Sequence, residues 1–265
     1  MPKKTTLHTT SLFLFLFAAS SVLAQKIPAD WTQVGRTGDW GNTVAITAMN
    51  GSIWSIEADG TLFNTNKDGD YRQVGPKGFF KHATMLTSLD GSLYTVEEGT
   101  LYVTDPAKGK WKQLGAAGEW ANTAAIVGMN GYVWSIEEDG TLFKTAKDGT
   151  YEQIGPKGAF KDATLLAAMD GKLWTVEGGS LYSTDPSSGT WHLVGKAGDW
   201  QNTESLVASD GILWSIESNG TLYKSDKSGA YVQGGKIGEY KGATLMLAMG
   251  HSLYSVHDGT MYRTR

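Results

Sequence analysis

The sequence predicts an all-β protein, a six-bladed β-propeller made of six 40-residue repeats, and three observations lead to this prediction. A hairpin pattern, written WSIEEDGTLFKT at residues 134–145, recurs along the chain. Its first aromatic residue returns every 40 residues, and six such units fill residues 26–265. Glycine is abundant, with 34 residues, whereas proline is scarce, with 6, as expected for short strands joined by tight turns. Repeats of about 40 residues with several strands each are typical of propeller blades. The six aromatic positions are Trp54, Tyr94, Trp134, Trp174, Trp214 and Tyr254.

Each repeat contains four predicted strands. Turn signals at Asn50-Gly51 and Asp59-Gly60 separate alternating apolar runs, a strong indication of hairpins. The first strand carries small residues, which suits crowding around a central axis, and the second carries large aromatics, which suits packing between blades. In the first repeat the predicted strands are 43–49, 52–57, 61–65 and 71–75.

The two ends of the chain predict how the ring closes. The chain stops at MYRTR, after the third strand of the sixth repeat, and it opens with DWTQVG at 30–35, which matches the fourth strand of other repeats. The N-terminal strand therefore completes the last blade, and closure leaves only short, protected sheet edges. A β-trefoil also repeats hairpins threefold, but its units are shorter than the 80-residue pairs found here.

The repeats alternate, so that the true unit is a pair of blades present three times. The odd repeats open with GDWGNT, GEWANT and GDWQNT, and the even repeats with GFFKHAT, GAFKDAT and GEYKGAT. The linker between the second and third strands is also one residue longer in the odd repeats. A ring does not need this alternation in order to fold, so the alternation needs an explanation.

The N-terminus predicts export. Lys3 and Lys4 precede an apolar run from Leu12, and small residues end at Ala24, the order of a secretory signal peptide. We expect residues 1–24 to be this peptide, cleaved after Ala24, and residues 25–265 to be one propeller domain, secreted or periplasmic. The apolar run is too short to span a bilayer, so no membrane insertion is predicted.

Charge and composition argue against several classes of function. The net charge of −4 and the interspersed signs do not favour nucleic-acid binding, and five scattered histidines predict neither a metal site nor a cofactor. A sialidase needs three converging arginines, yet Arg36, Arg72, Arg263 and Arg265 cluster near the two ends of the chain. Carboxylates repeated threefold would share one environment, whereas acid–base catalysis needs two different ones. The sequence therefore predicts a protein that is not an enzyme.

The candidate site lies where the first strand begins. In an antiparallel blade this point is at the same end as the turn between the second and third strands, so an aromatic, an amide and a carboxylate come together. These groups suit a sugar, because the aromatic ring can stack on the C–H face of the sugar and the amide and carboxylate can bond its hydroxyls. Alternatively, the tryptophans fill gaps between blades and the repeated polar residues are structural. The predicted ligand-binding residues are Trp40, Asn42, Glu57, Trp120, Asn122, Glu137, Trp200, Asn202 and Glu217.

The repeat resembles a known family. The pattern G-x-x-W-S-I-E-x-D-G-T-L-Y, followed by Y-x-Q-V-G-x-x-G-x-W, is similar to the repeats of the tectonin and tachylectin-2-like β-propeller lectins. The resemblance covers residues 26–265 and implies several equivalent sugar sites between blades on one face, often for N-acetylated or methylated saccharides. Tachylectin-2 has five blades with longer repeats, so only the W-x-N at the start of the first strand is carried over to this chain.

Together these observations predict a secreted, multivalent carbohydrate-binding propeller. Equivalent weak sites suit such a protein, because multivalency raises avidity by ~10²–10⁴. The alternative is an extracytoplasmic scaffold for protein–protein interactions whose repeats are purely structural.

Overall fold

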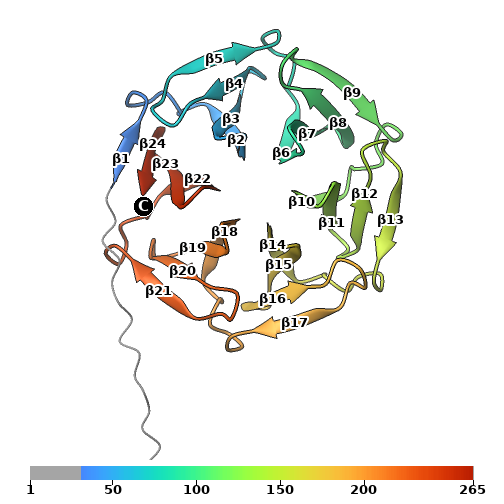
Figure 1. Cartoon of the computed structure of the whole chain (residues 1–265), viewed down its shortest axis with the longest axis vertical. Helices are drawn as coiled ribbons and strands as arrows, with labels where there is room; N and C mark the ends of the chain where they lie inside the picture. The colour runs from blue at the N-terminus through green and yellow to red at the C-terminus, as the bar shows by residue number, and fades with distance from the viewer. Residues whose placement is uncertain (1–30, 265) are drawn as a thin grey trace, which may run out of the picture.

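The computed structural model describes residues 31–264 as six four-stranded antiparallel sheets that form a closed ring (Figure 1). The predicted six-bladed β-propeller is thereby confirmed. The predicted signal peptide and its cleavage site lie outside the described residues.

Blades 1, 3 and 5, here called the odd blades, are each continuous in sequence, and their sheet order follows the chain. Their strands are, in blade 1, β2 (Thr43–Met49), β3 (Ser52–Glu57), β4 (Leu62–Thr65) and β5 (Tyr71–Val74); in blade 3, β10 (Thr123–Met129), β11 (Tyr132–Glu137), β12 (Leu142–Thr145) and β13 (Tyr151–Ile154); and in blade 5, β18 (Thr203–Ser209), β19 (Ile212–Glu217), β20 (Leu222–Ser225) and β21 (Tyr231–Gly234).

Blades 2, 4 and 6 are here called the even blades. Blades 2 and 4 follow the chain in the same way, and blade 6 takes its outer strand from the N-terminus. Their strands are, in blade 2, β6 (Ala83–Leu89), β7 (Ser92–Glu97), β8 (Thr100–Asp105) and β9 (Lys110–Leu114); in blade 4, β14 (Ala163–Met169), β15 (Lys172–Glu177), β16 (Ser180–Thr184) and β17 (Trp191–Val194); and in blade 6, β22 (Ala243–Met249), β23 (Ser252–His257), β24 (Thr260–Thr264) and β1 (Thr32–Val34).

The predicted strands of the first repeat match the structure closely. β2 and β3 have the expected bounds, and β4 begins at Leu62, one residue later than expected. The pairing of Thr43 with Glu57 confirms that the start of the first strand lies beside the turn between the second and third strands.

The ring closes as predicted. β1 pairs antiparallel with β24, with Thr32 opposite Arg263 and Val34 opposite Met261. Figure 1 shows the N-terminal strand on the outer side of the last blade, next to the C-terminus.

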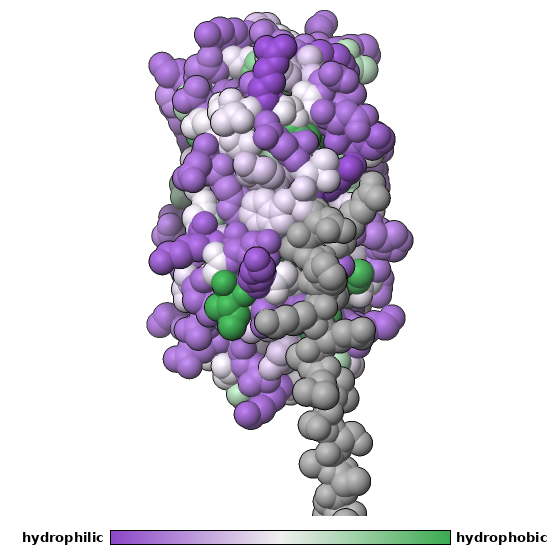
Figure 2. Space-filling view, turned by 90° about the vertical axis from the view of Figure 1, so that its left-hand side faces the viewer, coloured by the Kyte–Doolittle hydropathy of each residue, from purple (hydrophilic) through white to green (hydrophobic). Residues whose placement is uncertain are grey.

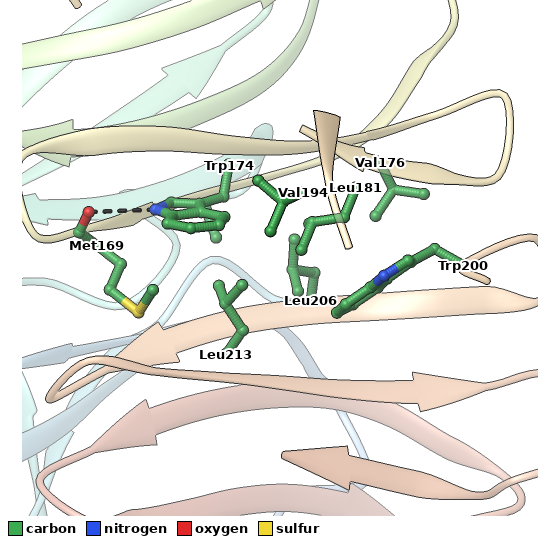
Figure 3. Close-up of a cluster of buried hydrophobic side chains, with 9 residues drawn as sticks. Met169, Trp174, Val176, Leu181, Val194, Trp200, Leu206 and Leu213 are labelled. Atoms are coloured by element: carbon green, nitrogen blue, oxygen red, sulfur yellow. Dashed lines mark hydrogen bonds between the residues drawn. The ribbon is translucent and has the colours of Figure 1, made fainter. Parts of the chain in front are cut away.

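The core is divided among the contacts between neighbouring blades. Figure 3 shows one of them, where Trp174 of blade 4 lies above Leu213 of blade 5 and its Nε1 donates to the Met169 carbonyl oxygen at 3.2 Å. The aromatics that open the second strands are all buried, as predicted. Burying one such side chain removes ~150–250 Å² from water, an upper bound of about 4–6 kcal/mol.

The first strands surround the axis of the ring. Small and aliphatic residues of all six blades line a central cavity of about 230 Å³. Hydrogen bonds cross between these strands, since the Ser88 hydroxyl donates to the Ala48 carbonyl oxygen at 2.7 Å and the Gly128 amide donates to the Thr87 hydroxyl at 3.0 Å.

The outside of the ring is mostly polar. The side seen in Figure 2 is dominated by hydrophilic residues, with few apolar ones among them. Across residues 31–264 no helix has the length and apolarity needed to cross a membrane.

Candidate functional site

Each odd blade carries a pocket at the same position. In blade 1 the pocket has a volume of about 130 Å³, in blade 3 about 180 Å³ and in blade 5 about 40 Å³. The pockets share seven kinds of lining residue, namely a loop acid, a loop tryptophan, a serine and a glutamate of the second strand, an aromatic of the third strand, a tyrosine of the fourth, and a threonine or serine that ends the third strand (Thr65, Thr145 and Ser225). The first six are Asp39, Trp40, Ser55, Glu57, Phe63 and Tyr71 in blade 1; Glu119, Trp120, Ser135, Glu137, Phe143 and Tyr151 in blade 3; and Asp199, Trp200, Ser215, Glu217, Tyr223 and Tyr231 in blade 5.

The alternation of side chains along a strand places each pocket between two blades. Ile53, Ser55 and Glu57 lie on the same face of β3, since successive side chains point to opposite faces. Ile53 packs in one cluster with Trp40 and with Tyr254 of blade 6. The pocket of blade 1 therefore lies on the face that meets blade 6, beneath the loop that joins the two blades.

Three aromatic rings form the apolar wall. Trp40 is 5% exposed and its Nε1 donates to the Val34 carbonyl oxygen at 3.3 Å, which fixes the indole against blade 6. Phe63 and Tyr71 meet edge to face with their centroids 5.5 Å apart, and Tyr71 is 61% exposed. The accessible aromatic surface at the pocket is thus supplied chiefly by the tyrosine of the outer strand.

A contact between two glycines bounds the pocket of blade 1. Gly69 lines the pocket in the turn after β4, with φ of +95°, and a side-chain carbon there would meet the backbone nitrogen of Gly35. This close approach brings the turn of blade 1 onto the end of β1 in blade 6.

The glutamate of each pocket is half-buried. The Thr43 hydroxyl donates to Glu57 Oε1 at 2.8 Å, and Thr123 does the same for Glu137 at 2.8 Å. Burial raises the pKa of the Glu57 carboxyl, and it does so for Glu137 and Glu217 as well, because it disfavours the charged form. In blades 1 and 3 the nearby lysines pair with other acids, Lys77 with Asp59 at 3.0 Å and Lys157 with Asp139 at 3.3 Å.

Hydroxyl groups face the pockets without protein partners. Ser135 is 1% exposed and Thr145 is also 1% exposed, and within residues 31–264 neither side-chain oxygen has a hydrogen bond. Ser225 in the pocket of blade 5 is in the same state. Thr104 and Thr184, which occupy the Thr145 position in blades 2 and 4, also lack a partner, so Ser135 is the hydroxyl that distinguishes the pocket of blade 3. A buried hydroxyl without a partner costs about 1–3 kcal/mol, so a polar ligand or water is expected at such an oxygen.

The even blades use the same positions differently. There the residue in the serine position bonds the strand-end side chain, since Thr95 donates to Glu97 at 3.3 Å and Thr175 donates to Glu177 at 2.7 Å. In blades 1 and 3 the glutamate accepts its hydrogen bond from Thr43 or Thr123 instead, at a position where even blades have alanine, and the serine does not make this bond.

The outer strands of blades 2 and 4 carry tryptophan in place of tyrosine, and in blade 6 Trp31 stands directly before β1. This indole packs across the face on which the odd blades have their pocket. Centroid distances are 4.5 Å for Trp111 to Tyr102, 5.7 Å for Trp191 to Phe160 and 4.8 Å for Trp31 to Tyr240. The alternation in the sequence thus corresponds to open pockets in odd blades and to aromatic packing in even blades.

The structure places the predicted site residues in two groups. Each predicted tryptophan and glutamate lines its pocket, but the tryptophans Trp40, Trp120 and Trp200 are each only 5% exposed and act as walls. The exposed asparagines Asn42, Asn122 and Asn202 are outside these pockets, and their carbonyl oxygens accept the amides of Ala58, Glu138 and Ser218. Asn122 instead lines a separate depression of about 280 Å³ beside Glu137.

The sequence prediction missed the outer-strand tyrosines. Their signal was present, since Tyr71, Tyr151 and Tyr231 alternate along the chain with Trp111, Trp191 and Trp31. Among residues 31–264, no three His, Asp or Glu side chains come together as a metal site.

Comparison with known proteins identifies the fold. Neither a protein-family model nor a curated protein sequence matches the chain. Among solved structures, the chain is similar to the calcium-binding protein regucalcin of Agrobacterium tumefaciens strain C58, at 12% identity and a TM-score of 0.66 over 91% of this chain and 95% of that one. It is similar to virginiamycin B lyase of Staphylococcus aureus, at 16% identity and a TM-score of 0.59 over 86% and 82%. It is also similar to YCF48 of Cyanidioschyzon merolae, at 10% identity and a TM-score of 0.59 over 89% and 98%.

These similarities show the propeller fold. The resemblance to tectonin and tachylectin-2-like lectins stays a prediction made from the motifs.

Proposed function

We propose that this protein is a secreted, multivalent carbohydrate-binding propeller with one sugar site in each odd blade. The observation that carries the proposal is the pocket formed by an aromatic wall, a half-buried glutamate and hydroxyl-bearing side chains, which recurs in blades 1, 3 and 5. Aromatic rings suit the C–H face of a sugar, and the polar groups suit its hydroxyls. Export rests on the N-terminal sequence alone.

The likeness of the three pockets suits repeated binding of one kind of ligand. Burial raises the pKa of Glu57, Glu137 and Glu217 alike. Three similar pockets therefore fit three similar binding sites.

The distribution of exposed apolar residues favours sugar over a protein partner. A scaffold is expected to concentrate such residues in one patch. Of the nine exposed large apolar residues in the described chain, five occupy equivalent positions around the ring, namely Tyr71, Trp111, Tyr151, Trp191 and Tyr231. The other four are Val44, Phe79, Leu193 and Ile237. One similar structure is YCF48 bound to D1 peptide, so a protein partner stays the alternative.

A glycan array tests the proposal with a variant that fills the pockets. The triple variant Tyr71→Trp/Tyr151→Trp/Tyr231→Trp gives the odd blades the indole that even blades carry, and we expect it to fold and to lose sugar binding. The matched control is Tyr71→Phe/Tyr151→Phe/Tyr231→Phe, which keeps the rings and is expected to keep binding. Absence of sugar binding by the parent protein would contradict the proposal and direct the search to protein partners.

A further inference from the structure

The pockets of the odd blades combine negative charge with aromatic rings. In blade 1 the carboxylates of Asp39 and Glu57 line the same cavity as Trp40, Phe63 and Tyr71, and the lining contains no lysine or arginine. The same holds in blade 3 and in blade 5. A cation would therefore find carboxylate oxygens and aromatic rings in one cavity whose lining holds no basic side chain.

The glutamate of the pocket has one carboxylate oxygen available to such a ligand. The Thr43 hydroxyl occupies Oε1 of Glu57, and no hydrogen bond from residues 31–264 reaches its Oε2. Asp39 is partly engaged, because its Oδ2 accepts the Arg36 amide at 2.8 Å. Glu57 is therefore the main charged group available to a ligand.

Aromatic rings add to the attraction for a cation. An ammonium group over the face of Trp, Tyr or Phe gains ~0.5–2 kcal/mol from the ring quadrupole. The hydroxyls of Ser135, Thr145 and Ser225 have no protein partner and can bond further polar groups of the same ligand. A simple quaternary ammonium has no hydroxyls to offer them, whereas an amino sugar carries both kinds of group.

We propose that the odd-blade pockets bind a saccharide through a free, protonated amino group, so that the ligand is an amino sugar without its N-acetyl group. This inference rests on the proposed function and specifies its ligand. The ammonium lies against Glu57, Glu137 or Glu217, and the sugar ring lies between the loop tryptophan and the outer-strand tyrosine.

Isothermal titration calorimetry tests this with a glucosamine tetramer and the matched N-acetylglucosamine tetramer, both at neutral pH. We expect the amine to bind at least about tenfold more tightly, a difference of about 1.4 kcal/mol. The variant Glu57→Gln/Glu137→Gln/Glu217→Gln should lose this preference. The even-blade variant Glu97→Gln/Glu177→Gln changes the same position of the repeat and should keep it.

The possible outcomes separate the two proposals. Equal or tighter binding of the N-acetylated tetramer, or an equal effect of the even-blade variant, would overturn the amino-sugar inference while carbohydrate binding stands. If neither tetramer binds and a glycan array is also negative, both proposals fail.

Discussion

At the scale of single residues, the half-buried glutamates of the odd blades place a charge where the fold disfavours it. Burial raises the pKa of Glu57, Glu137 and Glu217, so the folded state binds their protons more tightly than the unfolded chain does. The stability contributed by each protonated group is fully present below the ordinary glutamate pKa of about 4.3, and it is lost as the pH rises through the raised value.

The variant Glu57→Gln/Glu137→Gln/Glu217→Gln is therefore expected to be more stable than the parent at pH 7. Glutamine is neutral at every pH, and its oxygen can still accept the hydroxyls of Thr43 and Thr123. The gain should disappear near pH 4, where the parent carboxyls are also neutral. Thermal unfolding of both proteins between pH 4 and pH 7 measures this. A gain that does not change with pH would show that charge is not its cause.

The loop tryptophan and the outer-strand tyrosine of the pocket should respond differently to truncation. Trp40 is 5% exposed and packs against blade 6, so Trp40→Ala is expected to destabilise the fold by ~3–5 kcal/mol. Tyr71 is 61% exposed, so Tyr71→Ala should cost much less while removing the accessible ring of the pocket. Urea unfolding of the two variants gives the comparison, and similar losses would contradict the assigned burial.

The burial of Trp40 could not be predicted from its local sequence. Its indole is covered by Tyr254, Val256 and Met261, residues more than two hundred positions away that become neighbours only when the ring closes. Glu57 was easier to place, because the antiparallel pairing of β2 and β3 alone sets it opposite Thr43.

At the scale of elements, the turns between strands decide how closely neighbouring blades approach. The strands themselves were predictable, since Asn50-Gly51 and Asp59-Gly60 mark the ends of alternating runs. Contacts between a turn and the next blade were not, because the repeat period says nothing about the twist that brings Gly69 onto Gly35.

A pair of glycine variants separates this contact from backbone strain. Gly69 and Gly38 have φ of +95° and +84°, so an alanine at either position carries the left-handed penalty of ~1–2 kcal/mol. Only at Gly69 would the new carbon also meet the backbone of Gly35, whereas nothing lies within 4 Å at Gly38. Gly69→Ala should therefore lower the free energy of unfolding by clearly more than Gly38→Ala, as measured by urea unfolding. Equal losses would mean that the turn moves away without cost.

At the scale of the whole molecule, the proposed function would depend more on the threefold repetition of the pocket than on the affinity of one pocket. The pockets belong to alternate blades of one closed ring, so under this proposal a ligand with several copies of the same group would engage more than one of them. Linked weak sites of this kind raise avidity by ~10²–10⁴ when the geometry permits simultaneous binding. The sequence predicted this number of sites, because the 80-residue period is visible without the structure.

Closure of the ring depends on one strand of three residues, and removing it tests the architecture. A chain that begins at residue 36 lacks β1, whose Val34 is 1% exposed and pairs with Met261 of β24. The open edge of β24 is then free to pair with another chain. We expect a lower midpoint of thermal unfolding and self-association in size-exclusion chromatography, whereas a chain that begins at residue 31 should stay closed.

A peptide of residues 30–36 should bind the shortened chain and restore its stability, since an added strand can complete an exposed sheet edge. The same peptide with Val34→Asp should not, because its carboxylate would have to enter the apolar contact between blades 6 and 1. A shortened chain as stable as the longer one would mean that five complete blades hold the sixth without its outer strand.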